Sequence, residues 1–208
     1  MLPWSTHEET EEVRDMLEPV RGPELIGLLE RSFAATSAVL KAVPPQRRDD
    51  PTPCEGWTVG QLGGHLVGGA TYFGRSAAGM APDLPTEEPR SLGDDTTAAF
   101  REAVEFNLAA FRRPGVLDAD HGFVFGPTPG WVIASISLSE VLLHGWDLAR
   151  ALDLPYSPDD GAVDAVLRFQ MQGSEDQLRA EGMFAPAEQA PPNATPLQEL
   201  VAFTGRLP

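Results

Sequence analysis

Two histidines and one glutamate are the side chains whose type and spacing could support chemistry. Glu140 and His144 are four residues apart, which puts both side chains on one face of a helix. Their segment is strongly apolar, so a carboxylate and an imidazole there cost several kcal/mol unless something compensates them. His65 stands between Leu62 and Leu66 in a second segment of apolar and small residues. These three polar side chains must therefore find partners, either one another or a bound ion.

Spacing alone leaves two interpretations open. In the first, Glu140 and His144 hydrogen-bond to each other, and His65 is a core histidine with satisfied nitrogens. In the second, His65 joins them as the third ligand of a divalent cation. Two imidazoles and one carboxylate are a ligand set of catalytic zinc, which keeps positions open for water or substrate. A pair of residues four positions apart is common, and it does not decide between the two.

The segments that must position these residues have apolar side chains at helical spacing. Gly22-Pro23 opens a first helix that Pro44-Pro45 stops, and Thr58 caps a second, with Gln61 placed as in a capping box. Further helices are predicted over 94–113, over 130–154, over about 159–182 and from 195 onward. Residues 121–125 are the best candidate for a short strand. The pattern predicts an all-α fold, with four principal helices in a bundle and additional short helices.

Charge and cysteine content exclude several classes of protein. The chain has 208 residues, 42% of them hydrophobic, and a net charge of −16. Such a charge argues against nucleic acid and against an anionic membrane surface as partners. No apolar run reaches the roughly 20 residues that span a bilayer. A single cysteine and an N-terminus without the features of a secretory signal favour a cytoplasmic protein.

The acidic residues are concentrated at the N-terminus. Residues 1–20 contain six aspartates and glutamates against Arg14 alone. We expect a solvated acidic extension there. The remaining residues, 21–208, are expected to form one domain.

Three stretches of the chain resemble the motifs of a large bacterial family. They are TPCEGWTV running on to HLVG (residues 52–59 and 65–68), SEVLLHGWDLAR (139–150) and PLQELVAFTGR (196–206). The chain is similar to the DinB-like metal-binding proteins. Within them it resembles the mycothiol-dependent branch that includes maleylpyruvate isomerase and mycothiol S-transferases, as a short single-domain member.

The resemblance implies an antiparallel four-helix bundle with a divalent metal near one end of its central cavity. By matching position, the metal ligands are His65, Glu140 and His144. Zinc is the metal implied first, with nickel, iron or manganese as alternatives, and mycothiol is the implied co-substrate. Maleylpyruvate isomerase has a second, C-terminal domain that this sequence does not contain, so its particular reaction is not carried over. Glycines replace larger residues between Thr58 and His65, which predicts a different cavity wall.

Four other residues are candidates for lesser roles. Asp147, three residues after His144, either orients that imidazole from behind the metal or makes an ion pair or a helix cap. Cys54 is expected to be a packed structural residue, because the sequence identifies no partner that would activate its thiol. Trp57 is expected in the core or in the pocket wall. His121 is expected in an exposed loop rather than at the metal.

These observations predict a metal-dependent enzyme that uses a low-molecular-weight thiol, with mycothiol as the implied one. The thiol would be transferred to a small electrophile or would assist its isomerisation. Two alternatives remain: a metal-dependent hydrolase or cyclase of secondary metabolism on the same fold, and a non-catalytic protein that binds a metal or a small molecule. The sequence leaves the electrophile open, and equally whether the chain forms a homodimer.

Overall fold

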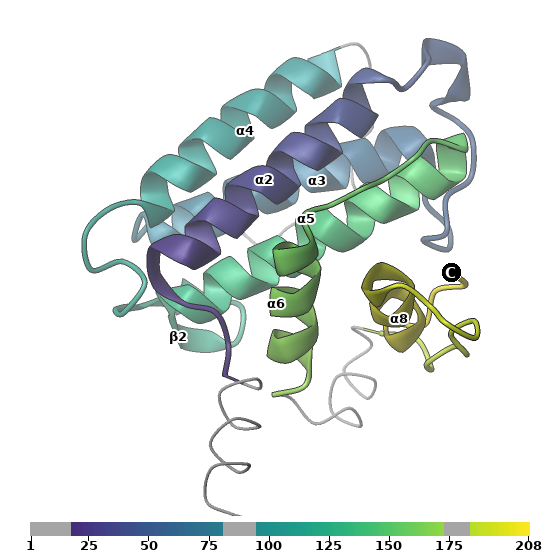
Figure 1. Cartoon of the computed structure of the whole chain (residues 1–208). Helices are drawn as coiled ribbons and strands as arrows, with labels where there is room; N and C mark the ends of the chain where they lie inside the picture. The colour runs from purple at the N-terminus through teal and green to yellow at the C-terminus, as the bar shows by residue number, and fades with distance from the viewer. Residues whose placement is uncertain (1–17, 81–94, 173–183) are drawn as a thin grey trace, which may run out of the picture. The chain divides into compact units, whose positions relative to one another are not determined.

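The computed structural model describes residues 18–80, 95–172 and 184–208 (Figure 1). Within these ranges the chain forms six α-helices, one short 3₁₀ helix and a two-stranded sheet. Their order is α2 (Gly22–Lys41), η1 (Pro45–Arg47), α3 (Val59–Ala77), α4 (Thr96–Phe111), β1 (Asp120–Phe123), β2 (Gly126–Pro129), α5 (Gly130–Leu152), α6 (Asp160–Gln170) and α8 (Pro196–Phe203). The prediction of a mostly helical protein is confirmed, and the small sheet is an addition to it.

The chain divides into two compact units. One is Arg21–Ala162, and the other is Val163–Pro208 together with the first twenty residues. Helices α2, α3, α4 and α5 and the sheet belong to the larger unit. In the smaller unit, α8 begins at the capping box of Thr195 and Gln198, where the sequence predicts its start. The three residues with candidate chemistry all lie in the larger unit.

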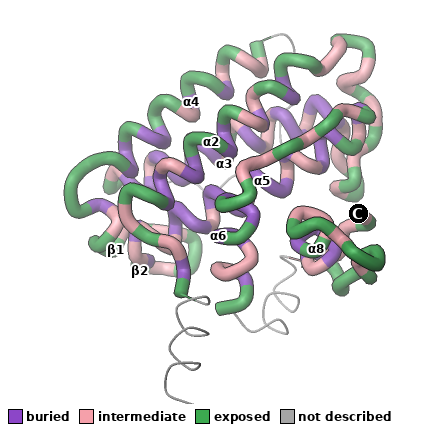
Figure 2. The backbone as a smooth tube through the Cα atoms, in the orientation of Figure 1, coloured by how far each residue is buried: buried purple, intermediate pink, exposed green. Residues whose placement is uncertain are grey.

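In the larger unit, four helices pack in pairs: α2 contacts α4 and α5, and α3 contacts the same two helices. The largest side chains that are fully buried come from all four helices, and they include Phe100, Phe111, Leu29, Leu62 and Leu142. Each contributes about 1.5–3 kcal/mol through burial. Buried positions recur along each of these helices (Figure 2), so the polar residues among them have an apolar environment.

Helix α5 has the most buried residues of this core. Among the described helices, it alone is long and apolar enough to cross a membrane by length and composition, and 72% of its most apolar window is buried inside the protein. A central core helix passes the same test, and α5 packs against both α2 and α3. Its apolar character is therefore explained by its place in the core.

Helix α3 begins where the sequence predicts, because its first turn is capped. The Thr58 hydroxyl accepts a hydrogen bond from the backbone N–H of Gln61 at 3.3 Å. In return, the Gln61 side chain accepts one from the backbone N–H of Thr58 at 2.9 Å. Two donors at the open end of the helix are thereby satisfied. The cap places His65 two turns into α3.

Arg47 fastens the segment before α3 to the end of α5. Its guanidinium donates to the carbonyl oxygens of Ala151 at 2.9 Å and Leu152 at 3.0 Å. It also pairs with Asp50 at 2.6 Å. The last carbonyls of a helix have no partner within it, so Arg47 supplies the donors that α5 lacks there.

The sheet is a hairpin that lies against α3. β1 and β2 are antiparallel, with Phe123 opposite Gly126. The Ser76 hydroxyl donates to the Gly122 carbonyl at 2.6 Å, and the Phe123 ring lies 6.0 Å from that of Phe73. The strand predicted over 121–125 is thus found at Asp120–Phe123. The sequence did not predict its partner, β2, because two of the four residues of β2 are prolines and one is a glycine, which is not a strand pattern.

Two predictions fall partly on residues outside the described ranges. The acidic extension over 1–20 is one, since the description begins at residue 18. The helix over about 159–182 is the other. Its first part is α6, which ends at Gln170, and residues 173–183 lie outside the described part.

Candidate metal centre

The two histidines and the glutamate singled out by the sequence converge in the larger unit. His65 comes from α3, whereas Glu140 and His144 come from successive turns of α5. One carboxylate oxygen, Glu140 Oε2, lies 3.1 Å from His65 Nε2 and 3.2 Å from His144 Nε2. The two imidazole rings are 4.9 Å apart and nearly perpendicular. The three donor atoms all lie within 4.8 Å of one another.

Glu140 and His144 shift the pKa values of each other. Burial opposes ionisation of Glu140, but the hydrogen bonds and positive charge of His144 and His65 outweigh it and lower the pKa of Glu140 well below its usual value. Burial also opposes a charged His144. Hydrogen bonds with Asp147, Cys54 and Glu140 outweigh that effect and raise the pKa of His144 well above its usual value. The two shifts have a shared cause, because Glu140 and His144 each stabilise the charged form of the other.

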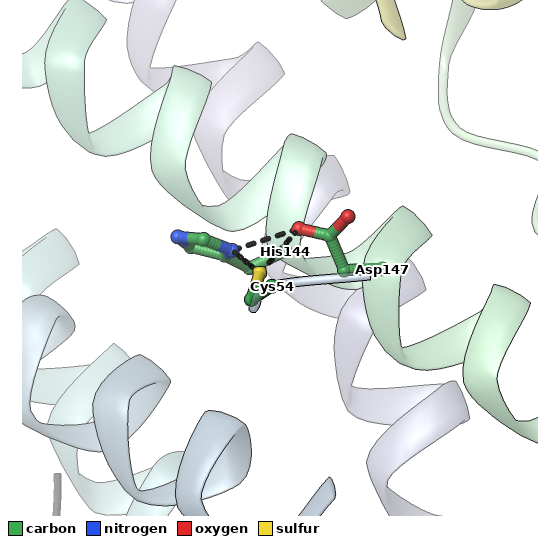
Figure 3. Close-up of side chains that lie close together, drawn as sticks. All are labelled: Cys54, His144 and Asp147. Atoms are coloured by element: carbon green, nitrogen blue, oxygen red, sulfur yellow. Dashed lines mark hydrogen bonds and ion pairs between the residues drawn. The ribbon is translucent and has the colours of Figure 1, made fainter. Parts of the chain in front are cut away.

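The other nitrogen of His144 has partners of its own (Figure 3). His144 Nδ1 donates to Asp147 Oδ2 at 2.9 Å. The Cys54 thiol donates to the same oxygen at 3.2 Å, and its sulfur lies 3.6 Å from Nδ1. The Asp147 side chain is fully buried. A buried carboxylate thus accepts two hydrogen bonds and binds the Nδ1 edge of the imidazole.

A tight turn before α3 brings Cys54 to this position. Pro51 and Thr58 form an antiparallel bridge, and within the turn the Trp57 N–H donates to the Cys54 carbonyl at 3.0 Å. Gly56 has φ = 80°, a left-handed conformation that favours glycine. The Trp57 ring lies 4.7 Å from that of His65. Trp57 therefore lines the site. Of the two locations expected from the sequence, the core and the pocket wall, this is the second.

On its inner side the cluster is closely packed. Between α2, α3 and α5 the structure leaves a cavity of only about 10 Å³, lined by His65, Glu140 and mostly apolar residues that include Phe33 and Phe73. That is space for about one water molecule. Conversely, 24% of the His65 side chain and 40% of the Glu140 side chain are exposed. These exposed parts of His65 and Glu140 are accessible to a ligand.

Other residues that the sequence considered have different environments. His121 lies half-buried on strand β1, so the expectation of an exposed loop was wrong. Its Nε2 is 2.8 Å from the Val116 carbonyl oxygen, and His121 belongs to neither group of converging donors found among the described residues. Cys54 is the residue whose surroundings the sequence missed. Its neighbours are 90 and 93 positions away, so no local pattern could indicate them.

The donor atoms suit a divalent cation. Two imidazole nitrogens and one carboxylate oxygen form a set that zinc and similar metals bind, with other positions left for water or substrate. A second group, Cys54, His144 and Asp147, also brings three donor atoms within 4.8 Å. Asp147 is fully buried there and already accepts two hydrogen bonds. The more exposed set of His65, Glu140 and His144 is the one that fits a reactive centre.

Comparison with known proteins agrees with the resemblance found in the sequence. The family model of the mycothiol maleylpyruvate isomerase N-terminal domain matches residues 29–149, a span that includes both groups of donors. An uncharacterized protein of Mycobacterium tuberculosis, found in strains CDC 1551 and H37Rv, is 32% identical over 178 residues, covering 85% of this chain and 94% of the relative.

Two solved structures share the fold. They are the crystal structures of the mycothiol-dependent maleylpyruvate isomerase and of a point mutant of it, with TM-scores of 0.51 and 0.50 and identities of 16% and 17%. Each similarity covers 70% of this chain and 66% of the other, so the matched part is just under two thirds of that enzyme. On the match to its family model, the chain belongs to the mycothiol maleylpyruvate isomerase N-terminal domain family.

Proposed function

We propose that this protein is a metal-dependent enzyme that uses a low-molecular-weight thiol, with mycothiol as the first candidate. The observation that carries the proposal is the convergence of His65, Glu140 and His144, with both Nε2 atoms directed at one carboxylate oxygen. Membership of the family and the printed name of the related isomerase support the thiol.

His65, Glu140 and His144 would hold a divalent cation, zinc being our first choice. When bound, such a cation supplies a Lewis acid that lowers the pKa of a thiol and so favours the nucleophilic thiolate at neutral pH. Glu140 contributes the one negative charge among the three ligands. His144 offers Nε2 because Nδ1 is already bonded to Asp147. Trp57 covers one side of His65 and limits the approach of water there.

The reaction would take place on the exposed side of the cluster, because the inner side has no room for a substrate. Loss of the S–H proton to solvent water would give a thiolate, whose lone pair forms a bond to an electrophilic carbon. In a transfer reaction, a leaving group departs from that carbon with the bonding electrons. In an isomerisation, the sulfur adds to a double bond, the resulting single bond rotates, and the sulfur is expelled again. Both reactions need the same thiolate.

Several finer features belong to the same proposal. We infer that α2, α3, α4 and α5 form an antiparallel four-helix bundle, a view supported by their pairwise packing. We retain the division into an acidic extension, 1–20, and a metal-binding domain, 21–208. A cytoplasmic location agrees with the single cysteine. A homodimer remains a hypothesis that sedimentation would test.

One experiment separates the proposal from its alternatives. The purified protein is analysed for metal content and then incubated with mycothiol and a bimane electrophile, with His65→Ala as the control. We expect bound zinc and thiol consumption that depends on His65. Bound metal without thiol consumption would favour the hydrolase, the cyclase or a non-catalytic metal-binding protein. Failure to bind any divalent metal would contradict the proposal altogether.

A further inference from the structure

The turn over residues 51–58 contacts both histidines of the candidate centre. Trp57 lies beside the His65 ring, at 4.7 Å between ring centres. Three residues earlier, the Cys54 thiol lies 3.6 Å from His144 Nδ1. The two histidines come from different helices, so this single turn holds the rings of both. That arrangement suggests a role for Cys54 beyond filling space.

The hydrogen bonds around Asp147 define what that role is. Its Oδ2 atom accepts from His144 Nδ1 at 2.9 Å and from the Cys54 thiol at 3.2 Å. Since the Asp147 side chain has no exposed surface, these donors take the place of water at this oxygen. A buried carboxylate that loses a donor pays for it in stability or moves to find another. The thiol therefore helps to fix the carboxylate, and the carboxylate fixes the ring.

We propose that Cys54 and Asp147 are positioning residues that act together on His144. Asp147 holds the Nδ1–H, which leaves Nε2 facing Glu140 at 3.2 Å. Cys54 keeps the Asp147 carboxylate in the orientation that accepts this bond. In this role the cysteine is a hydrogen-bond donor, and it forms no bond to substrate. The proposal deepens the metal centre described above and rests on it for its effect on metal affinity.

The test compares three variants. Cys54→Ala removes the thiol donor, whereas Cys54→Ser keeps a donor at the same position. The control is Thr36→Val, which removes a buried hydroxyl that donates to the Val141 carbonyl of α5 at 2.9 Å. Thr36 links α2 to α5 by a buried hydrogen bond, much as Cys54 links the turn to α5. Among the interactions of the described residues, Thr36 makes no contact with the His144 ring.

Zinc affinity is the first measurement. Changes behind a metal ligand typically reduce metal affinity by about 10–100-fold. We expect Cys54→Ala to lose about tenfold, at the low end of that range, because Asp147 itself is retained. Cys54→Ser should recover affinity to within about threefold of the wild type. Thr36→Val should lose stability and keep its affinity. Equal affinity in the wild type and Cys54→Ala would overturn the proposal, as would an equal loss in Cys54→Ala and Cys54→Ser.

A second measurement keeps this inference separate from the proposed function. In the metal-free protein, proton spectra correlated with labelled histidine nitrogens report the Nδ1–H of His144. We expect a resonance that exchanges slowly with water in the wild type, is retained in Cys54→Ser and Thr36→Val, and exchanges faster in Cys54→Ala. If this pattern holds but the wild type binds no zinc, only the metal centre is wrong. If the resonance is unchanged in Cys54→Ala, the positioning role of Cys54 is wrong.

Discussion

Replacing Glu140 by glutamine tests the charge at the centre of the candidate site. The change keeps the size of the side chain and an oxygen that accepts hydrogen bonds, but it removes the negative charge. If Glu140 only pairs with two histidines, the variant should have nearly normal metal content. If Glu140 is a ligand, two neutral imidazoles and an amide must hold the cation, and binding should weaken strongly.

The distances in the structure set the size of this effect. Unit charges 3.2 Å apart, the Glu140–His144 separation, interact by about 1 kcal/mol in water and about 5 kcal/mol at an effective dielectric constant of about 20. Since 40% of the Glu140 side chain is exposed, solvent screening favours the lower part of that range, about 1–3 kcal/mol. A divalent cation has twice the charge of an imidazolium, so the loss becomes about 2–6 kcal/mol. At about 1.4 kcal/mol for each factor of ten, affinity falls about 30-fold at the least and about 700-fold at the midpoint.

Two assays measure this loss. The first is the zinc retained after dialysis against a mild chelator. The second is the melting temperature with zinc added at a hundred times the wild-type dissociation constant, which stabilises the wild type by about 2.7 kcal/mol. A variant with hundredfold weaker binding gains only about 0.4 kcal/mol under the same conditions.

The matched control for Glu140→Gln is Glu105→Gln. Glu105 is 71% exposed on α4 and pairs only loosely with Arg101, at 3.9 Å. Glu105→Gln therefore removes one negative charge, as Glu140→Gln does, but leaves the candidate metal-binding cluster unchanged. Zinc retention in Glu140→Gln equal to that of the wild type and of this control would refute the assignment of Glu140 as a ligand.

Four further predictions concern the packing of the helices and the buried tyrosines. Gly145→Ala should lower stability by about 1–3 kcal/mol, because its new methyl group would collide with two hydroxyl groups that face α5. Gly68→Ala, on an open stretch of α3, should raise stability by up to about 1 kcal/mol. Arg47→Lys keeps the charge but loses the forked donor that closes α5, and should cost on the order of 1–2 kcal/mol. Burial raises the pKa of Tyr72 and raises that of Tyr156 to about 12. Because both folded-state values are above the unfolded one, stability should fall as pH rises from about 10 to 12, with phenolate absorbance appearing as the helices unfold.

Each of these has a result that would contradict it. If Gly145→Ala and Gly68→Ala shift the melting temperature in the same direction, the space around each glycine does not determine its effect on stability. A lysine at position 47 as stable as arginine would mean that the carbonyl contacts contribute nothing. Phenolate absorbance that rises near pH 10 in fully helical protein would show that both tyrosines reach solvent.

Local sequence was enough to predict most of the helices. The start of α3 follows from Thr58 and Gln61, and that of α8 from Thr195 and Gln198, because a capping box is complete within four residues. Glu140 and His144 could be placed on one face for the same reason, since helical geometry relates residues four positions apart. His65 could be added to this pair from its predicted inward position, but spacing alone did not decide between a metal and a simple hydrogen bond, and the family resemblance supplied the ligand set.

Contacts between distant segments were decided by the tertiary structure alone. The sequence left Asp147 with alternative partners and Cys54 with none, yet both meet His144 around one buried oxygen. Strand β2, whose prolines and glycine give no strand pattern, is identified only by its pairing with β1. A helix cap depends on neighbours in the chain, whereas a buried hydrogen bond depends on which surfaces the core brings together. That is why the candidate ligands, and Asp147 as a possible partner of His144, could be named from the sequence, whereas the contacts of Cys54 could be seen only in the folded protein.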